Sequence, residues 1–403
     1  MKNALKKIYL ILMVAAVLSG CSTENDLPVP SVGSDPVYFE IEFATRADGD
    51  EGDGGEGETE TPENPGIPTT PAPDYPSLTE YFVDGTSVIL ISQRGDRMSL
   101  DFNDEVPSQT DPSILVPNRN LYKYVYYTNP DANWDQGYNF QPYGNNALDW
   151  VYMESERLNG EYALGALYYP GGVTVYNEVQ EDQSIYNNLL KSNILGAWHR
   201  TNLFHDRIRF RFYHLMSAIR VTLLIPAWDS TDNTGFGEDA AQSAQLLKIK
   251  KAFNIDFPVA STEEPPTLQV TEAPETYDIN MYLDEVSNDV EEVNLKDIYY
   301  EFPDKIEKIR RVTFTVLLPV QQLTSDGPAM RFWLKSMSDV DISYVWYTRD
   351  IEDNSSFKVS KGAVTNMVLY LPRVATNAIL VDSYIDPWIE AESEFNVMPD
   401  DER

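Results

Sequence analysis

Residues 206–226 read DRIRFRFYHLMSAIRVTLLIP, and they form the most regularly patterned part of the chain. In its first half basic side chains alternate with the apolar Ile208, Phe210 and Phe212, which is the period of a strand with one buried face. In its second half the apolar phase moves by one position, to Ile219, Val221, Leu223 and Ile225. The register therefore slips somewhere in residues 213–218, which predicts a β-bulge or a strand that switches sheets.

Most of the chain is built from similar short apolar runs, separated by turn residues. Strands are expected over residues 87–92, 121–127, 150–153, 162–169, 247–257, 312–318, 342–346 and 367–371. Helical turns are expected over 181–190 and 240–246, and a loop over 229–239. This spacing of strands and turns predicts a mostly β protein made of antiparallel β-sandwiches. The length of 403 residues is enough for two such domains.

The charge balance excludes several partners. The formal net charge is −34, and it becomes −37 if the first twenty residues are removed, because 27 basic and 64 acidic residues then remain. A surface of this sign repels nucleic acid and anionic lipid headgroups. We therefore expect no nucleic-acid partner.

The N-terminus predicts export. A basic segment, residues 1–7, precedes an apolar run over 8–18 and the sequence Leu-Ser-Gly-Cys at 18–21. The apolar run is too short to cross a hydrocarbon layer of about 30 Å, so it is typical of a signal peptide, residues 1–20. Leu-Ser-Gly-Cys resembles a bacterial lipobox, with Cys21 as the lipidated residue; an ordinary secretion signal is the alternative. Cys21 is the sole cysteine, which excludes an intrachain disulfide.

The tether that follows contains one amphipathic strand. Val37, Phe39, Ile41 and Phe43 share one face of it, and Tyr38, Glu40 and Glu42 share the other. Residues 47–76 hold nine acidic residues, six Gly, six Pro and no basic residue, which predicts a disordered linker. A calcium site in residues 48–53 is disfavoured, because Gly52 stands where an EF-hand loop needs its fifth-position ligand.

The sequence contains no catalytic constellation. Its three histidines are His199, His205 and His214, and we interpret His214 as a buried residue satisfied by backbone at the register slip. Neither a zinc ligand set, a nucleophile elbow, a phosphate loop nor a dinucleotide fingerprint is present, so no enzyme activity, metal or cofactor is expected. Tyrosines and tryptophans could stack on sugar rings or be half-buried strand residues; they are Tyr122, Tyr124, Tyr126, Tyr127, Trp134, Tyr138 and Tyr143.

Taken in order, several motifs resemble the fimbrillin family of Bacteroidetes, the FimA/Mfa-like lipoprotein pilins. They are the lipobox at Cys21, the strand ending in Ala44-Thr45-Arg46, Tyr122-Lys-Tyr with Trp134, the segments 165–170 (GALYYP) and 210–221 (FRFYHLMSAIRV), Lys361-Gly362 before 367–371, and 385–388 (IDPW). The resemblance covers most of the chain.

The resemblance implies two transthyretin-like β-sandwich domains in tandem, which we place at residues 77–203 and 204–403, after a tether at 21–46 and the linker at 47–76. It also implies a palmitate-type lipid on Cys21, anchoring in the outer membrane with exposure at the cell surface, and cleavage between Arg46 and Ala47 by an arginine-specific surface protease. Cleavage would remove the strand that carries Val37, Phe39, Ile41 and Phe43, and a strand from another pilin subunit would fill the groove. The donor is expected from residues 384–397.

The resulting hypothesis is a structural subunit of a cell-surface pilus that supports adhesion, as shaft, anchor or tip. A surface glycan-binding lipoprotein of a polysaccharide-capture system is the alternative from another class. An acidic secreted hydrolase ranks last, because many carboxylates alone do not make an active site.

Overall fold

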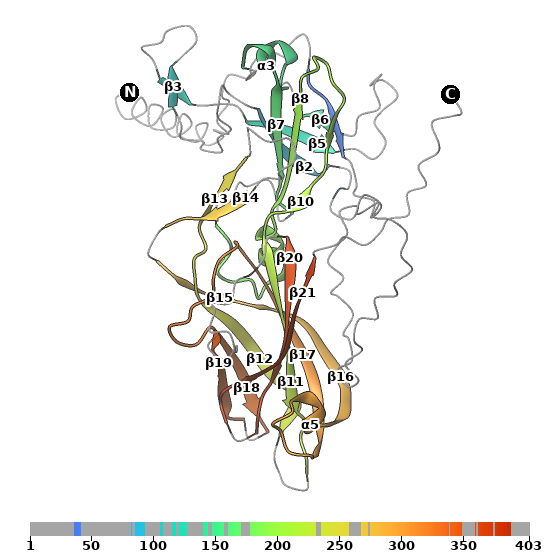
Figure 1. The fold of residues 1–403 in the computed structure, drawn as a ribbon, viewed down its shortest axis with the longest axis vertical. Coiled ribbons are helices and arrows are strands. Elements are labelled where there is room, and N and C mark those ends of the chain that lie inside the picture. The colour runs from blue at the N-terminus through green and yellow to red at the C-terminus, as the bar shows by residue number, and fades with distance from the viewer. Residues whose placement is uncertain are drawn as a thin grey trace, which may run out of the picture.

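The structure is a computed structural model, and strands dominate it (Figure 1). It describes residues 36–41, 82, 85–92, 105–107, 115–117, 121–126, 140–143, 147–156, 160–170, 178–230, 235–257, 267–272, 275–337, 339–348, 359, 362–373 and 375–387. The signal peptide, Cys21, Phe43, Arg46, Ala47 and the acidic linker lie outside these residues.

The upper half of Figure 1 is an eight-stranded sheet with the order β10-β8-β7-β2-β5-β6-β1-β9. Its strands are β1 (Phe39–Ile41), β2 (Ser87–Ser92), β5 (Leu121–Tyr126), β6 (Phe140–Pro142), β7 (Tyr162–Tyr168), β8 (Leu195–Thr201), β9 (Ile208–Phe210) and β10 (Tyr213–His214). The first and last strands of this order, β10 and β9, are separated by only two residues in the chain. The sheet therefore curls round until its two edges meet, and β1 lies within it.

Three further elements accompany this sheet. β3 (Glu105–Pro107) and β4 (Leu115–Pro117) pair with each other, and α3 (Trp150–Glu156) follows β6. Inside the curl lies a core rich in aromatic side chains, including Phe39, Tyr124, Phe140 and Phe210.

The lower half is a β-sandwich. One layer has the order β16-β17-β11-β20-β21 and the other β15-β12-β18-β19, with β13 and β14 as a separate pair. The bounds are β11 (Ser217–Pro226), β12 (Phe236–Ile249), β13 (Phe253–Asp256), β14 (Thr267–Val270), β15 (Tyr277–Asn280), β16 (Tyr282–Asn294), α5 (Leu295–Ile298), β17 (Ile306–Leu318), β18 (Met330–Ser336), β19 (Asp341–Trp346), β20 (Ala363–Tyr370) and β21 (Ile379–Pro387). Val221 and Leu223 of one layer share a core with Phe332 and Leu334 of the other.

The fold is therefore mostly β and sandwich-like, as the sequence predicted. Most pairs are antiparallel, but β1 pairs with β9 and β11 pairs with β20 in parallel. The eight-stranded sheet includes β9 and β10, so its strands extend beyond residue 203, where we placed the end of the first domain. The domain limits themselves stay a prediction.

The predicted register slip is present and marks a change of sheet. β9 pairs with β1, β10 with β8, and β11 with β17 and β20. Burial alternates as far as His214, and then Leu215, Met216 and every residue of β11 are buried. One continuous segment therefore crosses from the upper sheet into the centre of the lower one.

The two halves are joined by shared core residues and by a polar connector, residues 178–183. Leu167 and Leu215 belong to the same hydrophobic cluster as the sandwich core. The buried Gln183 side chain donates to the Leu317 carbonyl (2.8 Å) and accepts from the Leu317 N–H (2.9 Å). It therefore satisfies the backbone of β17 at a position beyond the last residue that pairs with β16.

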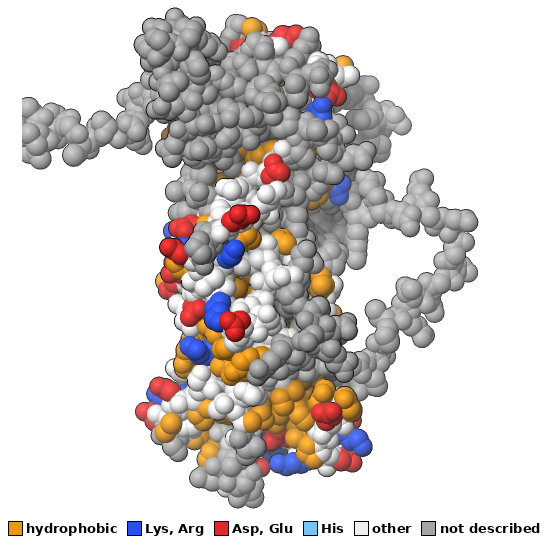
Figure 2. Space-filling model, turned by 60° about the vertical axis from the view of Figure 1, so that its left-hand side comes forward, with side chains coloured by type: hydrophobic (Ala, Val, Ile, Leu, Met, Phe, Trp, Pro, Cys, Tyr) orange, Lys and Arg blue, Asp and Glu red, His pale blue; other side chains and the backbone are white. Residues whose placement is uncertain are grey.

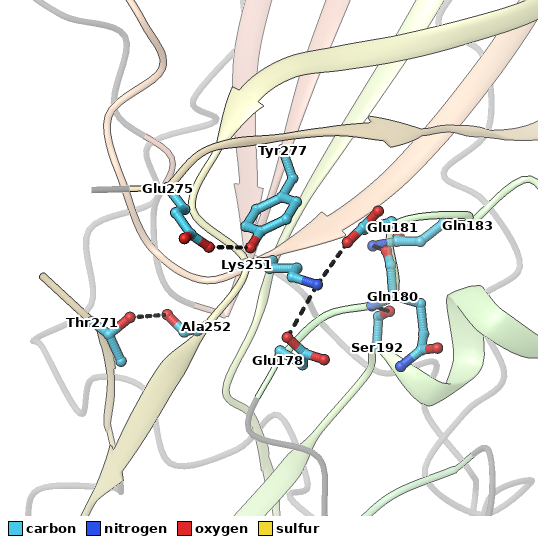
Figure 3. Close-up of polar contacts among 10 residues, drawn as sticks. All are labelled: Glu178, Gln180, Glu181, Gln183, Ser192, Lys251, Ala252, Thr271, Glu275 and Tyr277. Carbon is cyan, nitrogen blue, oxygen red and sulfur yellow. Dashed lines mark hydrogen bonds and ion pairs between the residues drawn. The ribbon is translucent and has the colours of Figure 1, made fainter. Parts of the chain in front are cut away.

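Figure 3 shows the outer end of this connector. Lys251 points between the carboxylates of Glu178 (3.2 Å) and Glu181 (2.6 Å), close to the ring of Tyr277. These contacts raise the pKa of Lys251, chiefly through the hydrogen bond to Glu181. The connector is thus fixed to the lower half by charge as well as by backbone pairing.

The prediction of a strand over residues 150–153 was wrong. These residues open helix α3, in which Trp150 and Met153 are buried and Val151 and Glu154 are exposed, the spacing of a helix rather than a strand. The Val151 N–H donates to the Asp149 carboxylate (2.8 Å), so an aspartate at the helix start satisfies a free backbone donor.

The prediction of a helical turn over 240–246 was also wrong, because these residues belong to β12. β12 shifts its register against β18 on either side of Ala241, as bulges do. The shifts leave Ala240 and Ala244 buried four residues apart, which imitates helical periodicity. β12 starts at Phe236, within the expected loop 229–239. The helix expected over 181–190 is the shorter α4 (Tyr186–Lys191).

Candidate functional site around the first strand

β1 lies between β6 and β9. It pairs antiparallel with β6 (Phe39 opposite Phe140) and parallel with β9 (Phe39 opposite Ile208). Just before β1, the Val37 N–H donates to the Leu148 carbonyl (2.7 Å). We call the space that β1 fills the β1 slot, lined by Tyr124, Phe140, Ile208 and Phe210.

Aromatic packing holds the inner face of β1. Phe39 is fully buried, stacks on Phe140 with ring centroids 4.3 Å apart, and meets Phe210 edge-on at 5.0 Å. Val37 is also fully buried, and Ile41 is partly buried against the same core. The alternation read from the sequence therefore places these side chains on the inner face of the sheet.

One buried hydroxyl anchors the start of the strand. The Tyr124 hydroxyl donates to the Val37 carbonyl (2.8 Å) and accepts from the Leu148 N–H (3.2 Å). Burial raises the pKa of Tyr124 well above its usual value, so the phenol stays protonated and remains a donor. An inserted backbone that offers a carbonyl here satisfies this donor, whatever its side chains.

Charges hold the outer face. Glu40 accepts from Arg207 Nη2 (2.7 Å) and from Arg209 Nε (2.5 Å). The Glu40 side chain is 11% exposed and the arginines are about half exposed. A single carboxylate on β1 thus bridges two arginines of the neighbouring strand.

Loss of β1 would leave complementary defects on every side of the slot. The facing edges of β6 and β9 would lose their partner strand, the Phe140 and Phe210 rings would lose Phe39, and Tyr124 would lose an acceptor. Unpaired edges beside an apolar surface bind another strand readily. The arrangement is therefore suited to binding an extended peptide rather than to chemical catalysis.

The structure brings three of the predicted site residues together, Val37, Phe39 and Ile41. Phe43, Cys21, Arg46 and Ala47 lie outside the described residues, so lipidation, cleavage and removal of the strand stay predictions. Tyr124, Phe140 and Glu40 were not predicted from the sequence to contact the first strand or its slot. The alternating arginines of 207–211 were visible in the sequence, but nothing in it indicated that they face Glu40.

Comparison with known proteins gives similarity of structure alone. The sequence matches no protein-family model and no curated protein sequence. A candidate cell adhesion protein of Bacteroides uniformis is 11% identical, with a TM-score of 0.42, over 77% of this chain and 94% of that one. A candidate cell adhesion protein of Bacteroides ovatus is 12% identical, with a TM-score of 0.41, over 77% and 89%. A fimbrial protein of Bacteroides ovatus is 12% identical, with a TM-score of 0.29, over 71% and 44%.

None of the three histidines is among the residues that line the β1 slot. His214 Nδ1 lies 3.0 Å from the Asn193 amide oxygen, so a side chain contacts it where we expected backbone, and burial lowers its pKa to about 3. His199 lies 3.6 Å from the Asp206 carboxylate, and His205 packs against Trp150. Within the described residues, no group of His, Cys, Asp and Glu could hold a metal ion.

The tyrosines considered for sugar stacking are mostly internal. Tyr122, Tyr124 and Tyr126 are buried in the strand, and only Tyr143 is well exposed, with the Lys123 ammonium 4.0 Å from its ring centroid. Tyr127, Trp134 and Tyr138 lie outside the described residues. Of the four described tyrosines in this set, three therefore belong to the strand core and one lies on the surface.

The surface charges and the helices are the features in which a basic binding face or a membrane span would show. On the face drawn in Figure 2, the coloured Lys and Arg side chains lie among Asp and Glu rather than in one continuous basic patch. In the part of the chain that the structure describes, no helix is long and apolar enough to span a membrane.

Proposed function

We propose that this chain is a structural subunit of a cell-surface pilus, assembled by strand exchange at the β1 slot after cleavage between Arg46 and Ala47, and that the pilus supports adhesion. The observation that carries the proposal is the position of β1. A short segment from the start of the chain lies inside a curled sheet, between two strands from much later in the sequence.

Energetics favour exchange over simple loss. Burying Val37 and Phe39 contributes about 1.5–3 kcal/mol each, so an empty slot costs roughly 3–6 kcal/mol before backbone hydrogen bonds are counted. A strand from another subunit recovers that free energy. Cleavage makes the exchange one-way, because β1 is then no longer covalently held beside its slot.

The N-terminal features fit the same function. A lipid on Cys21 would hold the precursor in the outer membrane at the cell surface, where an arginine-specific protease acts on residues 46–47. A copy that is not cleaved would stay tethered and serve as the anchor. Other subunits are thus the expected partners, and no reaction is catalysed.

The experiment that tests this is the N-terminal sequence and intact mass of the protein in its native host. Material sheared from the cell surface is compared with material left in the outer membrane. The proposal predicts an N-terminus at Ala47 in sheared, high-mass material. An acylated Cys21 in all of the material, with nothing polymeric in the sheared fraction, would overturn the maturation step and leave a tethered surface lipoprotein.

A further inference from the structure

The connection between β16 and β17 is longer than the pairing of these strands requires. The two strands pair antiparallel as far as Asn294 opposite Ile306. Antiparallel neighbours that meet in this way are usually joined by about two to five residues. Here the whole segment 295–305, which we call the α5 connection, stands between them and contains α5. Long connections on a rigid sheet are common places for binding residues, because the sheet positions them.

Hydrogen bonds hold the α5 connection in one shape. The Asn294 side chain accepts from the Lys296 N–H (3.1 Å) and donates to the Asp304 carboxylate (2.6 Å). The Leu295 N–H donates to the Lys305 carbonyl (2.8 Å), so the two ends of the connection are tied by backbone as well. Leu295 is also buried in the apolar cluster beneath α5. The connection is therefore a fixed platform on the end of the sheet.

A column of aromatic rings leads through this platform from the sheet to the solvent. Tyr370 of β20 is buried, and its hydroxyl donates to the Glu307 carboxylate (2.6 Å). The centroid of the Tyr370 ring lies 5.0 Å from that of Phe302, which lies 5.2 Å from that of Tyr299. Tyr300 forms the outer end of the column, with its ring centroid 4.9 Å from that of Tyr299, and is 71% exposed. Single exposed apolar side chains are common, but this ring is supported from beneath, so a ligand that covers it orders little.

The Tyr300 ring has the surroundings that sugar recognition needs. A pyranose ring presents C–H groups on its face and hydroxyl groups around its rim. The C–H groups pack well on an aromatic face, which is apolar and carries the negative part of the ring quadrupole. The Tyr300 hydroxyl donates to the Glu301 carboxylate (3.1 Å), which places that carboxylate at the edge of the ring. A carboxylate has further lone pairs, with which it accepts from the hydroxyl groups of a sugar.

Charge and size narrow the class of ligand. The chain has a net charge of −34, and the carboxylate beside Tyr300 adds to the repulsion of an acidic glycan. One tyrosine buries at most about 150–250 Å², whereas a stable protein interface buries about 800 Å² on each partner. The platform therefore suits an uncharged sugar better than an acidic polymer or a second protein.

We propose that the α5 connection binds a neutral glycan: a pyranose ring stacks on Tyr300, and the Glu301 carboxylate accepts hydrogen bonds from its hydroxyl groups. The inference goes beyond the proposed pilus, because it requires neither cleavage nor strand exchange. α5 lies at the bottom of the lower half in Figure 1, whereas the β1 slot lies in the upper half. Glycan binding and subunit assembly would thus use different ends of the molecule.

The test is affinity electrophoresis of the full-length chain, purified in a non-ionic detergent that has no sugar headgroup. Each native gel contains one neutral polysaccharide, which is mannan, xylan, glycogen or a mixed-linkage β-glucan. A further gel contains polygalacturonate as the acidic comparison. The wild-type chain should be retarded by at least one of the neutral polysaccharides and should run freely in polygalacturonate.

Four variants test the role of the ring. Tyr300→Ala should weaken binding by about tenfold or more, because the stacking surface is lost. Tyr300→Phe keeps the ring and should bind within about threefold of the wild type, whereas Glu301→Gln keeps the shape but removes the charge and should bind about threefold or more weakly. The matched control is Tyr143→Ala, since Tyr143 is 58% exposed but follows β6 in the upper half, and it should leave binding unchanged.

Four results would overturn the inference: no retardation of the wild type by any neutral polysaccharide, retardation by polygalacturonate alone, wild-type binding by Tyr300→Ala, or an equal loss with Tyr143→Ala. Equal urea midpoints for the wild type and Tyr300→Ala show that the variant folds. Binding is measured on the uncleaved chain. The absence of polymer and of an Ala47 terminus in the native host would therefore refute the pilus proposal without changing this result.

Discussion

Replacing Phe39 by alanine tests whether β1 is held as the structure indicates. The Phe39 ring is fully buried and contacts the rings of Phe140, Phe210 and Tyr124 at centroid distances of 4.3–5.0 Å. Truncating a buried phenylalanine costs about 3–5 kcal/mol, which includes the transfer of the ring and the cavity that it leaves. Because β1 is short and lies near one end of the chain, this cost should fall on its release from the slot rather than on the whole molecule.

Hydrogen exchange followed by mass spectrometry measures that release directly. When β1 leaves, the backbone N–H groups of β6 and β9 that face it become open to solvent. A loss of 3–5 kcal/mol corresponds to exchange faster by about a hundredfold to a few thousandfold, at tenfold for each 1.4 kcal/mol. The backbone of β17, in the lower sandwich, serves as the internal reference and should keep its protection.

Phe332→Ala is the matched control, since Phe332 is equally buried but lies in β18 of the lower sandwich. It should accelerate exchange in β18 and its neighbours and leave β6 and β9 unchanged. If Phe39→Ala changes exchange in β6 and β9 by less than tenfold, or loosens the lower sandwich equally, then β1 is not an independently released strand and the reasoning fails.

Three further predictions concern the joined halves and the turns. Gln183→Ala removes both hydrogen bonds to the Leu317 backbone. It should lower the free energy of unfolding in urea titrations by about 2–6 kcal/mol, at about 1–3 kcal/mol for each of the two buried backbone groups left unpaired. A change under about 0.5 kcal/mol would contradict the role of the connector. Burial lowers the pKa of His214 to about 3, so below about pH 6.5 the unfolded chain binds a proton that the folded chain does not. The free energy of unfolding should therefore fall by about 1.4 kcal/mol per pH unit as the pH drops below about 6.5. His214→Gln should flatten that slope, and an unchanged slope would exclude His214 as its source. Gly235 has φ +100°, and a Cβ there would meet the Ala227 carbonyl oxygen at 2.3 Å; Gly85, at φ +89°, has open space around that position. Thermal unfolding should therefore show Gly235→Ala to be more destabilising than Gly85→Ala by about 1 kcal/mol or more.

Local patterns predicted the fold where the strands are regular. The stretch 206–226 predicted the buried face of β9 and the place of the register slip, because its first half alternates strictly and its apolar phase then moves by one position. Residues 87–92 match β2 to the residue. The pattern failed at β12, since bulges around Ala241 convert a two-residue period into a four-residue one. It failed at α3 because the run Trp-Val-Tyr-Met at residues 150–153 has the composition of a strand.

The candidate site was predictable only on one side. The apolar face of β1 follows from its alternation, but its neighbours do not, because Glu40 contacts arginines 167 and 169 residues away. β6 contributes only three residues, too few to show a period. Such pairing depends on how the sheet curls, and that is a property of the whole fold rather than of any window of sequence.

The segment that passes from β9 through β10 into β11 also determines how a filament of these subunits would carry tension. A pull on an inserted strand would pass to β9 along the strand axis, then through the covalent chain to β11, and across the parallel ladder from Ala218↔Val364 to Leu224↔Tyr370 into β20 and β21. Load applied along paired strands strains all the hydrogen bonds of a ladder at once, in shear, whereas a pull across the strands breaks them one at a time. The sheet-switching segment would therefore transmit the load through the subunit. Rupture should begin at the shortest ladder on this path, the one between β9 and the strand in the β1 slot, which has three residue pairs when β1 fills it.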